Sequence, residues 1–150
     1  MMQYVIQTLM GALGSVGFAI LFNIRGKRLL LFFLGGALDW TVYLLCTHHG
    51  CSMFQGLLFA TMTATLSSEI LARLIQTPVL ISLVPMLIPL VPGSDLYYCM
   101  DALVRGEQDV FLARGSMAIS AAGAIALGII CTTAFSHIIF TVWHHIHKPK

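Results

Sequence analysis

The sequence LVPMLIPLVPG, residues 83–93, sets three prolines within eight residues of a continuous apolar run. Proline has no backbone N–H, so in a regular helix the carbonyl oxygens of Ile81, Pro85 and Ile88 would lose their usual donors. In hydrocarbon such backbone is tolerated only where it is buried in protein or lines a wet cavity. We therefore predict a broken helix over residues 77–104.

The residues after this run favour a restart of the helix. Gly93 supplies a flexible break and the following Ser94 and Asp95 supply an N-cap, so the first amides of the next helix would point at the break. Transporters use discontinuous helices to hold cations on freed carbonyls and carboxylates on helix N-termini. A merely kinked helix, repaired by hydroxyl groups and water, is the alternative. On the first interpretation, the residues of this segment on a substrate or ion pathway are Pro85, Pro89, Pro92, Gly93 and Ser94.

The composition places the whole chain in a membrane. Of its 150 residues, 58% are hydrophobic and 9% are charged, which leaves too little polar surface to cover a water-soluble globule. A spanning helix needs roughly 20 apolar residues, so four or five spans occupy nearly the entire chain. We expect an all-α integral membrane protein with about five transmembrane helices, in a single polytopic domain over residues 1–150.

The apolar runs and the basic residues predict the topology. The expected spans are residues 4–24, 29–47, 54–74, 77–104 (broken) and 116–142. The basic cluster at 25–28 indicates a cytoplasmic turn after the first span, hence an external N-terminus. Five spans and four spans each leave six of the eight Lys and Arg inside, so charge does not choose between them. We favour five, because residues 78–104 are long enough to cross even when interrupted.

The third span carries a polar face. Thr61, Thr65, Glu69 and Arg73 recur at four-residue intervals and therefore share one side of a helix. One interpretation is an ion pair between Glu69 and Arg73 near the cytoplasmic end. In the other, Glu69 couples to protons or binds an ammonium group, and the two threonine hydroxyls bind substrate.

Asp39 lies near the middle of the second span. An uncompensated charge at that depth is costly and marks either a transport pathway or a buried partner. The sequence leaves both interpretations open, and we include Asp39 among the candidate pathway residues.

Two spans carry small residues on one narrow face. The first has Gly11, Gly14 and Gly17, and small residues also follow one another at four-residue spacing in the last span. We interpret both faces as helix-packing surfaces. Because a short chain has few helices to fill them, they indicate assembly with another subunit or a second copy of the chain. In the last span these residues are Ser116, Ser120, Ala124, Gly128 and Thr132.

The sequence offers no recognisable catalytic or cofactor motif. It has no nucleophile elbow, phosphate loop or HExxH, so we expect neither enzymatic activity nor a cofactor. Histidines gather at 48–49 and at 144–147, on opposite membrane faces if there are five spans, and we interpret them as interfacial anchors rather than a metal site. The basic residues form short clusters at span ends, so nucleic acid is not an expected partner.

Four stretches of this chain together resemble a known family. In the order VGFAILFN (16–23), GALDW (36–40), SEILAR (68–73) and IPLVPGSDLYY (88–98), they look like the membrane half of threonine/serine exporter proteins. The proline string is the most specific of the four. The chain resembles the small, C-terminal-half subunit of a split two-component exporter.

This resemblance implies a function and a set of partners. It implies export of threonine, serine or a similar small metabolite across the bacterial cell membrane, driven by an ion gradient, together with a larger membrane subunit. A split pair of this kind is associated with succinate export, so a dicarboxylate is the alternative substrate, for which Arg73 is the one arginine that the sequence places near the pathway. A non-transporting assembly subunit is a second alternative. The family more usually has a small residue where this chain has Asp39.

Overall fold

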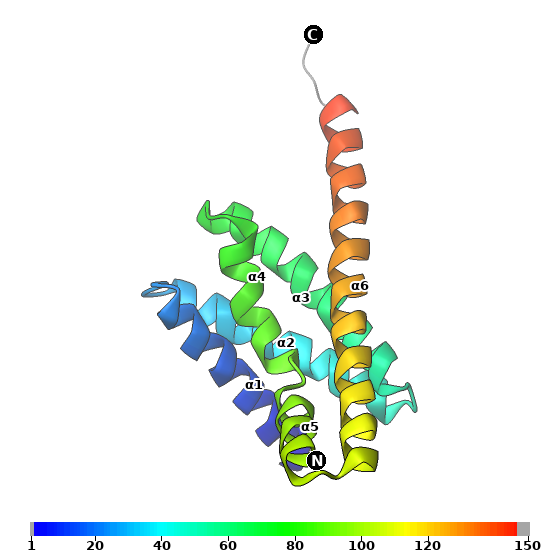
Figure 1. Cartoon of the computed structure of the whole chain (residues 1–150). Helices are drawn as coiled ribbons and strands as arrows, with labels where there is room; N and C mark the ends of the chain where they lie inside the picture. The colour runs from blue at the N-terminus through cyan, green and yellow to red at the C-terminus, as the bar shows by residue number, and fades with distance from the viewer. Residues whose placement is uncertain (1, 147–150) are drawn as a thin grey trace.

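The computed structural model describes residues 2–146 of the chain, and the side chains of residues 2–138. All regular elements in this part are helical, as predicted (Figure 1). In chain order they are α1 (Met2–Leu21), α2 (Arg28–His48), α3 (Met53–Ile75), α4 (Val79–Leu87), the 3₁₀ turn η1 (Ile88–Leu90), α5 (Gly93–Arg105) and α6 (Gln108–Ile146).

The helix lengths confirm a multi-pass membrane protein. Four helices, α1, α2, α3 and α6, are each long and apolar enough to cross a membrane. The pair formed by residues 79–90 and 93–105 passes the same test as one unit and is bent by 59° at the break. The fourth span is therefore broken, as the prolines predicted.

The last helix begins earlier than the expected span. Gly106 adopts a left-handed backbone (φ 74°) that ends α5, and α6 starts at Gln108 with Asp109 in its first turn, where a negative charge favours the helix N-terminus. The polar stretch before Ser116 is thus the start of α6 rather than a loop.

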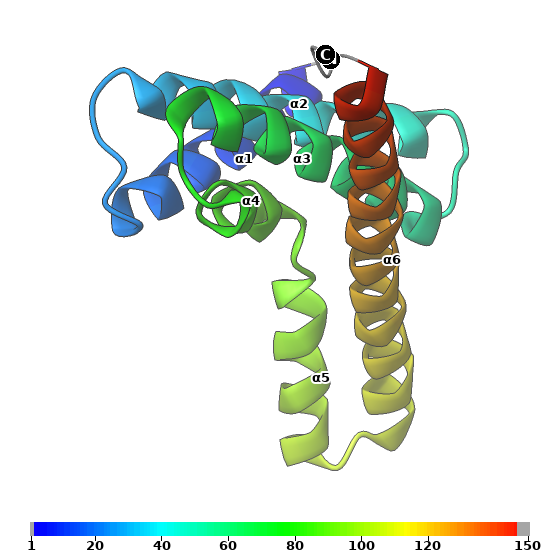
Figure 2. The same cartoon turned by 90° about the horizontal axis from the view of Figure 1, so that it is seen from above.

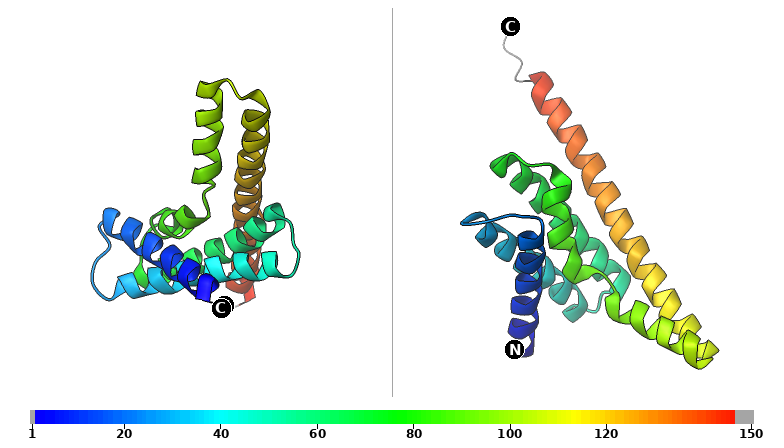
Figure 3. Two further views of the ribbon diagram at one scale, coloured as in Figure 1. Left: turned by 90° about the horizontal axis from the view of Figure 1, so that it is seen from below. Right: turned by 60° about the vertical axis from the view of Figure 1, so that its left-hand side comes forward.

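The helices form a bundle from which one hairpin projects. α2 packs between α1 and α3, and α3 packs against both α4 and α6. Among the described helices, α5 contacts α6 alone, and these two form an arm that leaves the layer of α1 to α4 (Figure 2). The views in Figure 3 show the remainder of α6 returning along the bundle beside α3. The break after η1 is therefore the point at which the chain leaves the bundle.

Candidate functional site

The helix break begins where α4 ends and the 3₁₀ turn η1 starts. Pro85 lies inside α4 and Pro89 inside η1. The carbonyl of Ile88, whose usual donor in a regular helix would be residue 92, a proline, accepts a hydrogen bond from the Val91 N–H instead, at 3.2 Å. The chain tightens here into a 3₁₀ turn, in which the donor lies three residues ahead of the acceptor rather than four.

The N-terminus of α5 faces the break without a side-chain cap. The helix starts at Gly93 with Pro92 as its N-cap, so Ser94 and Asp95 lie in the first turn and do not cap it as expected. The Leu96 N–H makes the first helical hydrogen bond, to the Pro92 carbonyl at 3.1 Å. The Ser94 and Asp95 amides therefore have no intrahelical partner, as is usual for the first amides of a helix.

An ion pair joins the start of α5 to α6. Arg114 Nη1 donates to Asp95 Oδ1 at 2.8 Å, and the guanidinium lies 5.5 Å from the centre of the Tyr98 ring. The Asp95 side chain is 11% exposed and that of Arg114 is 44% exposed. Sequence reasoning missed this arginine and named Arg73, which lies exposed in the last turn of α3. The available signal was that Asp95 and Arg114 carry opposite charges on the two sides of the short connection between two predicted spans.

Asp39 is buried on the face of α2 that meets both α1 and α4. It is 1% exposed, and neither carboxylate oxygen has a hydrogen-bond partner. On the same face, Gly35 lies against the methyl group of Met86 and Gly36 against the hydroxyl of Ser15. A carboxyl group is thus enclosed within the bundle with no donor from the described side chains.

Asp39 lies at the level of the break. Gly35 meets Met86, and Trp40 lines a shallow cavity of about 310 Å³ together with Ile88 and Pro89. The later residue of α2, Trp40, lies near the later residues of the other segment, Ile88 and Pro89, so α2 and α4 run parallel. Asp39, one turn beyond Gly35, is therefore opposite η1.

The polar face of α3 packs against α6. Ser136 Oγ donates to Glu69 Oε1 at 2.7 Å in a buried contact. Eight residues earlier on each helix, a Cβ added to Gly128 would lie 2.8 Å from the Thr61 Cβ. The two helices therefore run parallel with a constant offset, which sets Thr65 level with Thr132.

The predicted polar face of α3 and the predicted small-residue face of the last span are therefore the two sides of one interface. The Thr65 hydroxyl donates to the Thr61 carbonyl at 2.8 Å, whereas the hydroxyls of Thr61 and Thr132 are buried without a partner. Ala124 is buried as well, but Ser116 and Ser120 are exposed. The α3 helix thus covers the C-terminal part of the small-residue face of α6, and the N-terminal part of this face stays exposed.

The glycines of α1 differ in their surroundings. A Cβ added to Gly11 would lie 3.2 Å from the Trp40 Cβ, and one added to Gly14 would lie 3.8 Å from Pro89 Cγ. Gly17 has nothing within 4 Å. Gly11 and Gly14 therefore pack this face of α1 against α2 and against the helix break.

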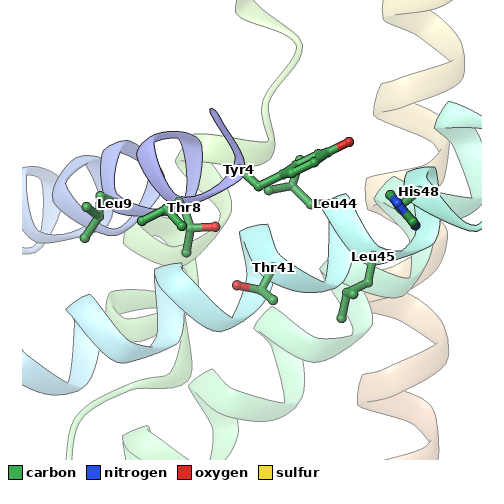
Figure 4. A pocket seen from close by; sticks show the side chains of 8 residues that line it. Tyr4, Thr8, Leu9, Thr41, Leu44, Leu45 and His48 are labelled. Carbon is green, nitrogen blue, oxygen red and sulfur yellow. The ribbon is translucent and has the colours of Figure 1, made fainter. Parts of the chain in front are cut away.

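A second, apolar pocket of about 540 Å³ lies between the N-terminal part of α1 and the C-terminal part of α2 (Figure 4). Tyr4 and His48 flank it, with ring centres 6.2 Å apart, and Thr41 turns its hydroxyl to the Ala37 carbonyl at 2.6 Å. No carboxylate, guanidinium or ammonium group lines this pocket. It therefore lacks the charges that would recognise an amino acid, in contrast to the break.

Within the part of the chain that the structure describes, no three histidine, cysteine or acidic side chains gather as a possible metal site. His144, His145 and His147 lie outside the described side chains.

The chain matches a known protein family. A family model described as threonine/serine exporter, ThrE, matches residues 7–135, a range that includes Asp39, the break and most of the α3–α6 interface. No curated protein and no solved structure matches the chain.

Proposed function

Because the chain belongs to the threonine/serine exporter family, we propose that it is the small membrane subunit of a secondary exporter of threonine, serine or a similar small metabolite. It works in the bacterial cell membrane together with a larger membrane subunit of the same family. Its role is transport, with no chemical change to the substrate.

The observation that carries this proposal is the helix break at residues 88–93 beside the buried Asp39. A zwitterionic amino acid needs a negative or carbonyl partner for its ammonium group and N–H donors for its carboxylate. The α5 amides and the Arg114 guanidinium offer donors at the break, since one guanidinium N–H serves Asp95 and others remain. Discontinuous helices within a bundle supply both kinds of partner in transporters.

The projecting arm supports a second subunit. α5 packs on α6 alone among the described helices, and Leu96, Tyr97 and Tyr98 in it are 50–67% exposed. One side of the break is thus uncovered by this chain. A path across the membrane would be closed on that side by the larger subunit.

A dicarboxylate such as succinate is the second candidate substrate, favoured specifically by Arg114. A second carboxylate requires a further cationic or N–H partner, and this guanidinium lies at the break with 44% of its side chain exposed. If the substrate is a dicarboxylate, Arg114→Gln will abolish its transport, and a threonine signal will be absent from the wild type.

Reconstitution tests the proposal. Liposomes containing both subunits should exchange internal unlabelled threonine, serine or succinate for the external labelled compound, whereas liposomes with either subunit alone should not. Absence of counterflow for all three compounds would contradict the transport function.

The same preparation tests a non-transporting assembly role. In that case Pro89→Ala and Glu69→Gln would leave counterflow unchanged in every complex that still assembles. The transport proposal expects Pro89→Ala to reduce it.

A further inference from the structure

We infer that Asp39 carries the coupling proton of this transporter, binding it in the enclosed state described here and releasing it when water reaches the break. The inference rests on the proposed transport function and goes beyond it by assigning the coupling group.

The first ground is burial without compensation. Asp39 is 1% exposed and both its oxygens lack a hydrogen-bond donor. An ionised carboxylate in that position would bear the full cost of desolvation, so a buried carboxyl without partners takes up a proton and becomes neutral. The neutral acid is the form that the observed surroundings of Asp39 accommodate.

The second ground is the absence of any neighbouring charge on the packed elements. α1 carries Tyr4 as its only titratable group, at the far end beside His48, and α4 and η1 carry none. On α3 the titratable groups are Glu69 and Arg73; Glu69 is held by Ser136 in the α6 interface. On α2 itself, Arg28 is exposed at the N-terminal end, and Tyr43, Cys46 and His48 follow Asp39 towards the C-terminal end. The charges of Asp95 and Arg114 at the start of α5, which does not pack against α2, are paired with each other.

The third ground is the choice between a proton and a metal cation. A cation such as Na⁺ needs several oxygen ligands converging on it, and Asp39 is the only carboxylate on this face of α2. The other buried oxygens without a partner on α1 and α4, the helices packed against this face, are the Ser15 and Ser82 hydroxyls, so the response to Na⁺ in the infrared experiment below distinguishes a proton from a cation. A single proton needs only the one carboxyl oxygen that it binds.

The fourth ground is position. Asp39 lies opposite η1, where the chain leaves the bundle and the backbone is not a regular helix. Ser15 and Ser82, both fully buried on α1 and α4, also have unpartnered hydroxyls. A movement of the arm that opens the break would admit water to this region. The O–H bond of the acid then breaks, the proton passes to water, and the carboxylate is hydrated.

Infrared spectroscopy tests the protonation directly. The wild-type complex in lipid should show a carboxylic-acid C=O band at neutral pH that is missing from Asp39→Asn and retained in the control Asp101→Asn. Asp101 is a partly exposed aspartate that accepts a hydrogen bond from Arg105. Raising the pH should convert the band to carboxylate bands regardless of Na⁺. In the difference spectrum between the wild type and Asp39→Asn, a carboxylate signal at neutral pH in place of the acid band, or a carboxylate signal that appears only with Na⁺, would overturn the inference.

Transport tests the coupling. A pH gradient across proteoliposomes should let the wild type and Asp101→Asn concentrate the substrate by up to about tenfold per pH unit for each coupled proton. Asp39→Asn should give no accumulation above equilibrium at any rate of transport, and accumulation equal to the wild type would refute the coupling role. If the wild type shows no counterflow at all, the proposed function fails, and the infrared titration alone decides whether Asp39 exchanges a proton. If Asp39→Asn does not assemble, the infrared titration of the wild type decides whether a buried carboxyl group exchanges a proton.

Discussion

Glu69 on α3 accepts a buried hydrogen bond of 2.7 Å from Ser136 on α6, across 67 positions of the sequence. The contact fixes the register in which the two helices pack, because Thr61 and Gly128 meet at the same offset. Polar hydroxyls thus line an interface inside the membrane region, where each unpaired group is costly. The pair therefore stabilises the docking of α6 as well as the position of the Glu69 carboxyl.

Removing the Ser136 hydroxyl should destabilise the chain. Ser136→Ala leaves Glu69 without its donor, and the expected loss of unfolding free energy is about 1–2 kcal/mol. Denaturation of the purified chain in mixed micelles, followed by circular dichroism, measures it. The matched control is Ser120→Ala on the exposed part of the same helix, which should stay near the wild type. Equal stability of both variants would show that the contact contributes nothing.

Gly128 should not tolerate a methyl group. A Cβ there would lie 2.8 Å from the Thr61 Cβ and 3.0 Å from the Leu58 carbonyl oxygen, whereas Gly123 has nothing within 4 Å. Gly128→Ala must therefore push α6 from α3, at an expected cost of about 1–3 kcal/mol. Gly123→Ala should be neutral or stabilising by up to about 1 kcal/mol, because alanine favours the helix.

The same denaturation measurement distinguishes these two glycine variants. If Gly128→Ala and Gly123→Ala shift the unfolding midpoint equally, the close approach of α3 and α6 does not require a glycine at position 128. A shift confined to Gly128→Ala supports the parallel register.

The sequence predicted the features that depend on local chemistry. The all-helical membrane class followed from composition, and the broken fourth span followed from the closely spaced Pro85, Pro89 and Pro92, because each proline in a helix interior removes an N–H from the hydrogen-bond ladder. The polar residues before Ser116 gave no sign that α6 begins at Gln108, because this start depends on the left-handed turn at Gly106 that ends α5.

Pairings between distant residues were beyond that reasoning. Periodicity placed Thr61 and Glu69 on one face and Gly128 and Thr132 on another, but no single helix reveals which face another helix will cover. The Asp95–Arg114 pair was missed for the same reason, since it depends on how α5 folds back on α6. For Asp39, only the structure shows that no donor approaches either oxygen.

Arg114 should contribute more to transport than an exposed arginine. Arg114→Gln removes the 2.8 Å contact with Asp95 and the positive charge at the break. We expect an increase of at least about tenfold in KM, equivalent to about 1.4 kcal/mol, measured as labelled substrate uptake by the reconstituted complex.

Arg105→Gln is the control for this charge change, because Arg105 pairs with Asp101 on the exposed side of α5, with 64% of its side chain accessible. Surface pairs of this kind contribute little. If the two arginine variants have the same KM, Arg114 does not take part in binding.

Pro89→Ala should repair the broken helix and thereby impair transport. Alanine restores the N–H that position 89 lacks, which favours continuation of α4 through η1 and removes the ring whose Cγ faces Gly14. Counterflow should fall at least about tenfold, a difference of about 1.4 kcal/mol in the limiting barrier, while the larger subunit still co-purifies. Pro78→Ala is the matched control, since Pro78 stands at the N-cap of α4, where no helical N–H is required. Full activity of Pro89→Ala in an assembled complex would mean that the break is a kink without a part in the pathway.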